Sequence, residues 1–298
     1  AMILVIGATG QLGGLIARLL LLRGDAVRAL VRDPASAAAR DLADAGAHLV
    51  LGDLTDAASL RTACESVRGI ITTANSMCRG DPDTIESVDR RGNANLVDAA
   101  VEQGVRRFVF ISALGADAHH PMPLLQAKGE TEQRLRESGM DWTVLQPDFY
   151  MDMLPMAVVG APALAGGAVT LVGEGRRRHS MVAISDVADY ALAAFDRDDA
   201  VGQALQIGGP EPVAWRDVLA AFERHLGREI PVSFVAPGQP IDGMPGMLCG
   251  LLAALETYDS PLDTGRLAKR FGVVPTSLDD FVHAVVAAAR GGAQMRTA

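Results

Sequence analysis

The sequence has few cysteines, few aromatic residues and fewer basic than acidic residues, and these shortages exclude several classes of protein. Cys64, Cys78 and Cys249 are an odd number at wide spacing, which suits neither a disulfide framework nor a metal site. We therefore expect no metal and a reducing, cytoplasmic setting. With a net charge of −9 and no zinc motif, basic stripe or aromatic platform, the chain is not expected to bind nucleic acid.

Long hydrophobic runs are also missing. No stretch of about 18 apolar residues occurs, so we expect no membrane span. The first apolar stretch, Met2–Ile6, is short and leads directly into a glycine loop, which favours a buried strand over a signal peptide. The only basic cluster in view, Arg176–Arg178, is either a local basic patch or a solvated surface turn.

What the chain does contain is an alternation of two kinds of segment over its first 146 residues. Short apolar, β-branched runs are separated by amphipathic stretches of helical period. This alternation predicts an α/β fold of the Rossmann type, a doubly wound parallel sheet with helices on both faces. The expected strands are Met2–Ile6, Ala26–Val31, His48–Leu51, Gly69–Thr73, Arg107–Ser112 and Trp142–Gln146, and the clearest helices are Gln11–Arg23, Thr84–Gln103 and Leu124–Ser138. Asp33 and Pro34 are expected to be the N-cap and first residue of the second helix.

After Gln146 the pattern changes, and residues 151–175 are rich in Met, Pro, Gly and Ala without a clear period. Helices and two short strands are expected beyond them. We therefore predict a Rossmann domain over residues 1–150 and a smaller, mostly helical C-terminal lobe over residues 151–298. The lobe is expected to be interleaved with the Rossmann core and unable to fold alone. The expected strands are Ala204–Ile207 and Pro231–Val235, and the expected helices are Ser185–Asp196, Ala214–Leu226, Leu251–Tyr258, Thr264–Phe271 and Ser277–Arg290.

Three glycines, Gly7, Gly10 and Gly13, directly follow the first strand and begin the first helix. The first permits a tight turn, the second allows the backbone to approach a pyrophosphate, and the third lets helix and strand pack closely. The helix N-terminus supplies free N–H groups for phosphate. We therefore predict a dinucleotide site whose phosphate loop consists of Gly7, Thr9, Gly10, Gln11, Leu12 and Gly13.

The residue that follows the second strand indicates which dinucleotide is bound. Arg32 lies 19 residues beyond Gly13, where NAD-binding proteins carry an acidic residue for the ribose 2′-hydroxyl. A guanidinium there accommodates a 2′-phosphate and stacks on adenine. Because helix capping is a simpler interpretation of Asp33 than ribose binding, we predict NADP(H).

Two further strand ends supply candidate cofactor contacts. Asp53, which Leu54 follows in the turn after the third strand, can accept a hydrogen bond from the adenine amino group or can cap the helix that starts near Asp56. Ala74 and Asn75 follow the fourth strand, and small residues there leave room for a ribose. We include all four among the expected cofactor contacts.

These motifs resemble the NmrA-like atypical short-chain dehydrogenase/reductase family, and in particular its NAD(P)H-dependent quinone and azo reductase-like members. The resemblance spans about residues 2–285. It implies an NADP-binding N-terminal domain, a substrate-binding lobe after about residue 150, and a monomer or homodimer. It fixes no reaction, because the family contains both reductases and redox-sensing regulators. The further segments that carry it are Gly104–Gly115, Lys128–Gln133, Trp142–Met151 and His179–Ala188.

Ordinary short-chain reductases place a Tyr four residues before a Lys, so that both lie on one helix face and the Tyr serves as acid or base. Here Lys128 matches the Lys, but Leu124 stands at the Tyr position. Lys128 is interpreted as the ribose anchor, or alternatively as a solvated helix residue that pairs with Glu132.

The missing acid leaves other candidates open. Tyr150, just beyond the sixth strand, can replace it, and His119 or His120 in the loop after the fifth strand can supply a proton near neutral pH. Phe149 or Tyr150, in the corner that begins at Pro147, can stack near the nicotinamide. Ser112 ends the fifth strand and can touch the nicotinamide ribose.

The expected reaction is reduction of a small conjugated or aromatic acceptor of quinone, enone or azo type by NADPH. A redox-sensing regulator that binds NADP(H) without turnover is the alternative, which Leu124 favours. An isomerase or epimerase that recycles its cofactor ranks third. Several methionines are interpreted either as the lining of a roomy apolar substrate pocket or as core filler. They are Met122, Met151, Met153, Met156, Met244 and Met247.

Overall fold

The computed structural model describes residues 2–77 and 79–296. The chain divides into two compact units. The first contains the residues up to Pro147 together with Ser185–Gln206 and Phe271–Val273. The second contains Asp148–Ile184, Ile207–Arg270 and the residues from Val274 onward. The domain boundary at residue 150 and the assignment of cofactor and substrate to the two parts stay predictions.

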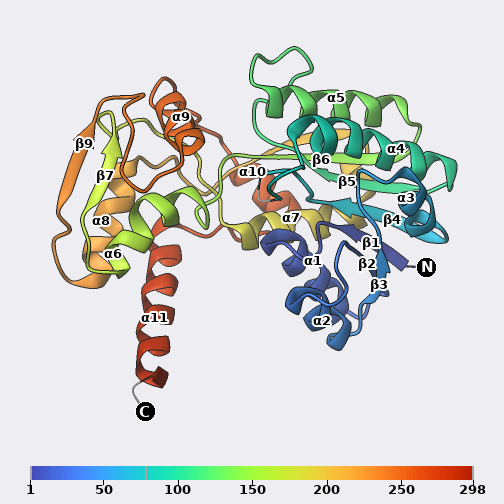
Figure 1. Ribbon diagram of the computed structural model, residues 1–298, viewed down its shortest axis with the longest axis horizontal. Helices are drawn as coiled ribbons and strands as arrows, with labels where there is room; N and C mark the ends of the chain where they lie inside the picture. Colours follow the sequence, from blue (N-terminus) through green and yellow to red (C-terminus); the bar gives the residue numbers. More distant parts are fainter. Residues whose placement is uncertain (1, 78, 297–298) are drawn as a thin grey trace. The chain divides into compact units, whose positions relative to one another are not determined.

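A seven-stranded sheet with the order β3-β2-β1-β4-β5-β6-β8 forms the centre of the first unit (Figure 1). The neighbouring strands from β3 to β6 are parallel throughout. Because the chain order reverses between β1 and β4, the switch point where such sheets bind ligands lies at the carboxyl ends of these two strands. The strands are β1 (Met2–Ile6), β2 (Val27–Val31), β3 (His48–Leu51), β4 (Val67–Thr72), β5 (Arg107–Ile111), β6 (Asp141–Pro147) and β8 (Gln203–Ile207).

Helices cover both faces of this sheet, which confirms the predicted doubly wound fold (Figure 1). One face carries α1 (Gln11–Leu22), α2 (Ala37–Asp44) and α7 (Ile184–Asp196), and the other carries α3 (Ala57–Cys64), α4 (Asn93–Glu102) and α5 (Pro123–Glu137). In α1, Leu12, Ile16 and Leu20 recur every four residues and are buried, as the helical period requires.

One local prediction was wrong, and one predicted helix is present but differs in its winding. The second helix begins at Ala37, where the Ser36 hydroxyl caps the Ala39 amide, whereas Asp33 accepts a 2.9 Å hydrogen bond from the Ala35 amide in the preceding turn. Asp33 stabilises this turn because an aspartate side chain readily accepts a hydrogen bond from the backbone amide two residues further along the chain, whereas the helix begins too far away for it to cap. The helix expected over 84–103 is π-helical at η1 (Ile85–Gly92) and becomes α-helical only in α4.

The second unit contains a small parallel sheet of β7 (Val169–Val172) and β9 (Val232–Val235), packed with helices around Trp215 and Phe222. Strand β7 lies inside residues 151–175, where the sequence showed no period. Among the described residues, no helix combines the length and the apolar character needed to cross a membrane. The remaining elements are η2 (Met156–Gly160), α6 (Ala161–Leu164), η3 (Asp198–Ala200), α8 (Trp215–Leu226), α9 (Gly246–Leu255), α10 (Gly265–Phe271) and α11 (Leu278–Arg296).

Candidate cofactor and active site

The glycine loop after β1 leaves no room for side chains at its first and third glycines. A Cβ at Gly13 would lie 2.1 Å from the carbonyl oxygen of Gly7, and a Cβ at Gly7 would lie 2.6 Å from Thr73 Oγ1. Gly7 also has a φ of +81°, which favours glycine. The Gly10 amide donates a 3.0 Å hydrogen bond to the Gly7 carbonyl, so the turn is closed before α1 begins.

The N-terminus of α1 has exposed backbone amides at the sheet's switch point. Gly10 is the N-cap residue and provides no side-chain hydrogen bond to the helix. Thr9, Gly10 and Gln11 are exposed, whereas Leu12 is buried in the core. This arrangement suits a pyrophosphate, because free N–H groups and the partial positive charge of the helix end both favour an anion.

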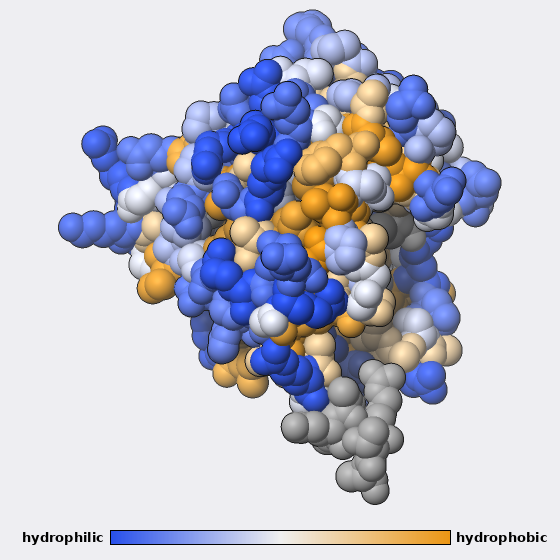
Figure 2. Space-filling view, turned by 90° about the vertical axis from the view of Figure 1, so that its left-hand side faces the viewer, coloured by the Kyte–Doolittle hydropathy of each residue, from blue (hydrophilic) through white to orange (hydrophobic). Residues whose placement is uncertain are grey.

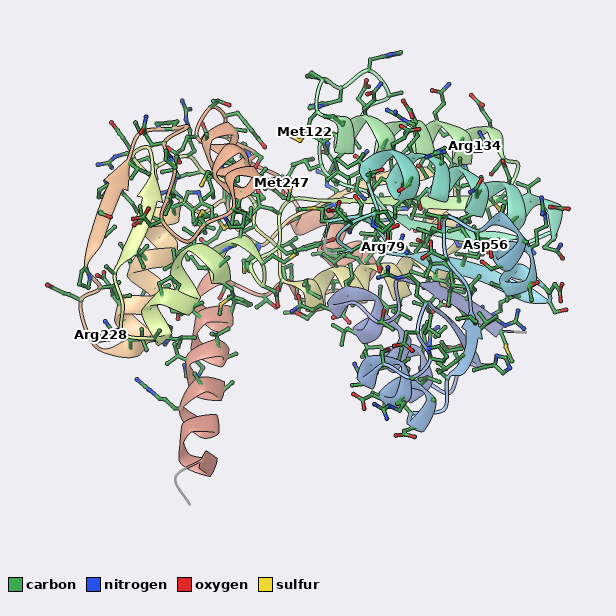
Figure 3. All side chains as sticks on the ribbon, in the orientation of Figure 1. Asp56, Arg79, Met122, Arg134, Arg228 and Met247 are labelled. Carbon is green, nitrogen blue, oxygen red and sulfur yellow. The ribbon has the colours of Figure 1, made fainter. Side chains whose placement is uncertain are left out.

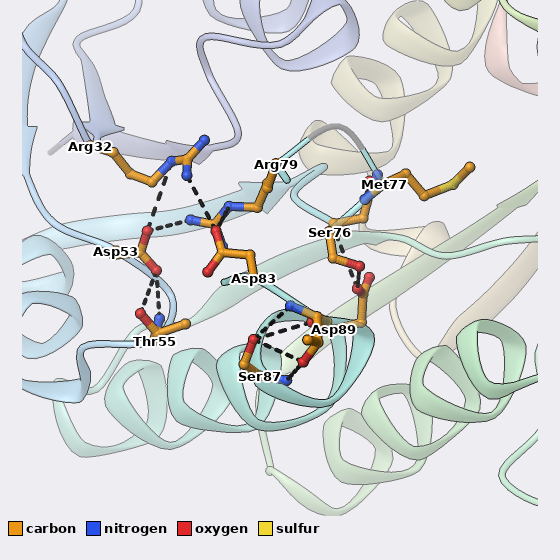
Figure 4. Close-up of polar contacts among 11 residues, drawn as sticks. Arg32, Asp53, Thr55, Ser76, Met77, Arg79, Asp83, Ser87 and Asp89 are labelled. Carbon is orange, nitrogen blue, oxygen red and sulfur yellow. Dashed lines mark hydrogen bonds and ion pairs between the residues drawn. The ribbon is translucent and has the colours of Figure 1, made fainter. Parts of the chain in front are cut away.

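Four charged side chains form a cluster where β2 and β3 end (Figure 4). Asp53 and Asp83 each contact both Arg32 and Arg79. Arg32 Nε lies 3.8 Å from Asp53 Oδ2, and Arg32 Nη1 lies 3.3 Å from Asp83 Oδ2. Arg79 Nε lies 3.1 Å from Asp83 Oδ2, and an Arg79 Nη2 hydrogen bond to Asp53 completes the cluster.

Asp53 is held as a charged group in its turn and does not cap a helix. Its Oδ1 accepts hydrogen bonds from the Thr55 amide and hydroxyl, both at 2.8 Å. Burial favours a higher pKa for Asp53, but these bonds and the charges of Arg79 and Arg32 outweigh it and lower the pKa. The capping alternative was wrong, because Asp56 caps α3 through the Ala58 and Ser59 amides.

The other expected adenosine contacts lie near this cluster in the chain. Leu54 is buried in the core beside α3 and α4. Asn75 Oδ1 accepts a 3.0 Å hydrogen bond from the Met77 amide, so this side chain stabilises its own turn. The Ala74 backbone packs closely against Gly7, since a Cβ on Gly7 would lie 3.0 Å from the Ala74 nitrogen.

Lys128 is buried in α5, with 6% of its surface exposed. Its Nζ donates a 3.1 Å hydrogen bond to the Ile111 carbonyl and lies 5.2 Å from the centre of the Phe110 ring. Burial lowers the pKa of Lys128, against the opposing charges of Asp89 and Glu132. The alternative of a solvated lysine was therefore wrong, whereas the role of ribose anchor stays a prediction.

The sequence reasoning missed Asp89, which lies in the π-helical segment η1 and is fully buried. Its Oδ2 accepts hydrogen bonds from the Ser76 amide and hydroxyl (Figure 4). Among the described residues, Asp89 Oδ1, Asn93 Oδ1 and Thr72 Oγ1 are buried without a partner. Unpaired polar atoms of this kind mark a place for water or ligand groups, and π-helical turns recur at functional sites.

Ser112 and the loop histidines form local contacts. Ser112 Oγ donates a 2.6 Å hydrogen bond to the buried Glu132 carboxylate, which also accepts from Gln146 and Arg136. His120 Nδ1 accepts a 3.0 Å hydrogen bond from the Met122 amide just before α5, and His119 is exposed. The role of either histidine as proton donor stays a prediction.

The comparisons with known proteins agree with this geometry. A family model described as NAD(P)H-binding matches residues 7–198. The chain belongs to this NAD(P)H-binding family. The resemblance to NmrA-like short-chain dehydrogenases/reductases found in the sequence is thereby confirmed.

Two relatives and one solved structure illustrate the family. The NAD(P)H azoreductase of Xenophilus azovorans is 33% identical over 235 residues, which cover 79% of this chain and 77% of that protein. The photosystem II assembly factor Ycf39 of Cyanophora paradoxa is 32% identical over 239 residues, 78% of this chain and 73% of that protein. An NADPH-dependent quinone oxidoreductase of Escherichia coli, complexed with NADPH, has a TM-score of 0.77 at 22% identity, covering 96% of this chain and 99% of that one.

The residues present fit the dinucleotide that this NAD(P)H-binding family binds. The glycine loop forms a cradle that a Cβ at Gly13 would fill. Arg79 Nη1 is buried without a partner among the described residues, so a donor for an anion is available. Arg79, which Figure 3 labels, lies in a loop without a recognisable motif, and the sequence reasoning therefore missed it.

In the second unit, a buried polar chain begins at Asp148, directly after β6. Asp148 Oδ2 accepts a 2.6 Å hydrogen bond from Ser260 Oγ and a 2.9 Å bond from the Ser180 amide. Ser260 Oγ lies 2.7 Å from His179 Nδ1, and His179 Nε2 lies 3.0 Å from the Leu255 carbonyl. Burial raises the pKa of Asp148 although these hydrogen bonds oppose it.

Phe149 and Tyr150 follow Asp148. The Phe149 ring stacks on Trp215 and packs against His179. Burial and the charge of Asp152 raise the pKa of Tyr150, so its phenol stays protonated. The raised pKa makes the phenol a weaker proton donor, and the roles of Tyr150 as acid and as cofactor contact stay predictions.

The methionines divide between core and surface. Met151 is buried in the core of the second unit, and Met156 and Met244 pack against that core. Met122, Met153 and Met247 are exposed, and Met247 projects from α9 (Figure 3). Figure 2 shows apolar residues on one face of the molecule. A substrate pocket lined by methionines stays a prediction.

The basic cluster forms no free patch. Arg176, Arg177 and Arg178 each pair with a carboxylate of the second unit, at 3.4, 3.2 and 3.3 Å. The partners are Glu174, Asp259 and Asp217, so the cluster is a neutralised surface turn.

Proposed function

We propose that this protein is an NADPH-dependent reductase that transfers a hydride to a small conjugated acceptor of quinone, enone or azo type. The observation that carries the proposal is the buried Lys128, whose ammonium makes one hydrogen bond, to Ile111, among the described residues. An ammonium has three hydrogens, so donors remain for the hydroxyls of a nicotinamide ribose. The azoreductase relative supports an electron-poor acceptor.

NADPH would supply the hydride when bound. The glycine loop would hold the pyrophosphate, and Arg32 would bind the 2′-phosphate. Lys128 would fix the ribose, with its charge supported by Asp89 and Glu132. Because Leu124 cannot donate a proton, the acceptor would take its proton from water or from Tyr150, although burial raises the pKa of Tyr150 and makes its phenol a weaker donor.

The test is cofactor binding followed by turnover on the full chain. We expect NADPH to bind more tightly than NADH, and NADPH absorbance to fall steadily with members of a panel of quinones, enones and azo dyes. Lys128→Met should lower kcat/KM at least about 100-fold, since positioning and electrostatic groups contribute this much. Lys269→Met, which removes the chain's only other lysine from an exposed site in α10, should change nothing.

A second function is favoured by the assembly-factor relative together with Leu124. The protein would then bind NADP(H) tightly without turnover and recognise a partner protein. Tight NADPH binding with no turnover across the whole panel, in protein that remains folded, would replace the reductase by this function. Equal or better binding of NADH would contradict the cofactor preference.

A further inference from the structure

In the four-residue cluster at the ends of β2 and β3, one carboxylate lies between the two arginines. Asp83 Oδ2 lies between two guanidinium groups, 3.3 Å from Arg32 Nη1 and 3.1 Å from Arg79 Nε (Figure 4). A carboxylate bridging two arginines occupies the kind of position that a phosphate oxygen takes in a two-arginine clamp.

The two arginines differ in their surroundings. The Arg32 side chain is 53% exposed, whereas the Arg79 side chain is 11% exposed. Arg79 Nη1 is buried and has no partner in the described part of the chain. Leaving a buried donor of a charged group unpaired is costly, so Arg79 is positioned to gain from a further anionic acceptor.

The two aspartates differ as well. Asp53 is fixed through its second oxygen by two hydrogen bonds from Thr55. The Asp83 carboxylate contacts only the two arginines among the described residues. The Asp83 amide donates a 3.0 Å hydrogen bond to the Gly80 carbonyl, so the backbone of this turn is closed and displacement concerns the Asp83 side chain.

We propose that Arg79 is a second ligand of the cofactor 2′-phosphate, and that Asp83 is a displaceable internal carboxylate which occupies the phosphate position in the free protein. The proposal rests on the NADPH preference of the proposed function and names a determinant of it beyond Arg32. Asp53 then serves as a positioning residue that keeps Arg79 aligned. Asp83 weakens binding of the phosphate, because the incoming anion must replace it.

Calorimetric titration with 2′,5′-ADP and with 5′-AMP tests the proposal without any turnover. The two probes share adenosine and its 5′-phosphate and differ only in the 2′-phosphate, so the ratio of their Kd values reports the 2′-phosphate contacts alone. Arg79→Met should weaken 2′,5′-ADP about tenfold or more and leave 5′-AMP unchanged, since a charge-assisted contact is lost. Arg91→Met, which removes an exposed arginine from η1, is the matched control and should leave the ratio unchanged.

Asp83→Asn keeps the proposal testable if Arg79→Met is poorly folded. Removing the competing charge should tighten 2′,5′-ADP about threefold to tenfold, while the affinity for 5′-AMP stays within error. An unchanged or weaker 2′,5′-ADP affinity in folded Asp83→Asn would overturn the displacement. A wild-type ratio near one would instead contradict the NADPH preference itself. A high wild-type ratio that neither variant moves would leave Arg32 as the determinant and reject the role of Arg79.

Discussion

Ser112 at the end of β5 donates its hydroxyl hydrogen to Glu132 in α5, at 2.6 Å, and both side chains are buried. We predict that Ser112→Ala lowers the free energy of unfolding by about 1–3 kcal/mol, because a buried carboxylate loses one of its donors. NADPH turnover should persist. Thr131→Val, which removes a hydroxyl bonded only to a helix carbonyl, is the control and should cost less. Urea denaturation measures both variants. An equal loss of unfolding free energy in Thr131→Val would contradict the importance assigned to the Ser112–Glu132 hydrogen bond.

Two adjacent arginines before and within β5 should differ sharply in their contribution to stability. Arg107 is buried and donates to the carbonyls of Asp141, Ala194 and Phe195 and to a threonine hydroxyl. Arg107→Met should therefore destabilise the protein by about 3 kcal/mol or more, since buried acceptors lose a charged donor.

Arg106→Met provides the comparison. Arg106 is exposed and pairs with Asp141 at the surface, so its loss should change stability far less than the loss of Arg107. Thermal or urea unfolding of the two variants measures the difference. Equal effects would contradict the importance assigned to the buried network.

Gly13→Ala should disrupt the phosphate loop even in the absence of cofactor. The added methyl group would meet the Gly7 carbonyl at 2.1 Å, and backbone cannot yield as a side chain can. A loss of about 1–3 kcal/mol is expected from such overpacking. Gly10→Ala, whose methyl would lie 3.3 Å from the same oxygen, should retain most of the stability. A Gly13→Ala protein as stable as wild type would show that the loop has a different conformation.

The buried chain from Asp148 to His179 predicts a pH dependence of stability. Because the pKa of Asp148 is raised on folding, the folded protein keeps this proton to a higher pH than the unfolded chain does. Its contribution to stability is complete at pH values below the ordinary pKa of a carboxyl and is lost as pH rises through the raised pKa. Asp148 faces His179, Tyr258 and Ser260, with Arg177 and Asp259 beyond them.

Asp148→Asn should remove this loss of stability with rising pH. Asp259→Asn is the comparison variant, because it should remove a pH dependence of the opposite sign. The Asp259 pKa is lowered, chiefly by the Arg178 amide, so the contribution of Asp259 is lost as pH falls instead. Urea denaturation of the three proteins as a function of pH measures the slopes. Identical slopes for wild type and Asp148→Asn would contradict the raised pKa of Asp148.

The sequence predicted the sheet well because its signals are local. Apolar runs, helical periods and the glycine loop depend on residues close together in the chain, and β1 and α1 follow from them. Strand β7 was missed because four residues within a stretch without a period resemble any apolar turn, and its pairing with β9 depends on residues about 60 positions away.

The missed site residues share a cause. Arg79 and Asp83 acquire meaning only from contacts with Arg32 and Asp53, which lie on other elements. Asp89 lies in a helical stretch whose π-helical winding the sequence pattern does not distinguish from an α-helix. Lys128, in contrast, was identified from its motif, although its burial depended on the packing of α5.

The interleaving of the two units constrains how the protein can be made and divided. The chain passes from one unit to the other after Pro147, Ile184, Gln206, Arg270 and Val273. During synthesis, the first unit therefore lacks β8 and α7 until the segment Asp148–Ile184 has emerged, and it exposes the edge of β6 in the meantime. A gene fragment ending near residue 150 would encode a sheet with an open edge, so recombining this half with other proteins should yield aggregates rather than a portable module.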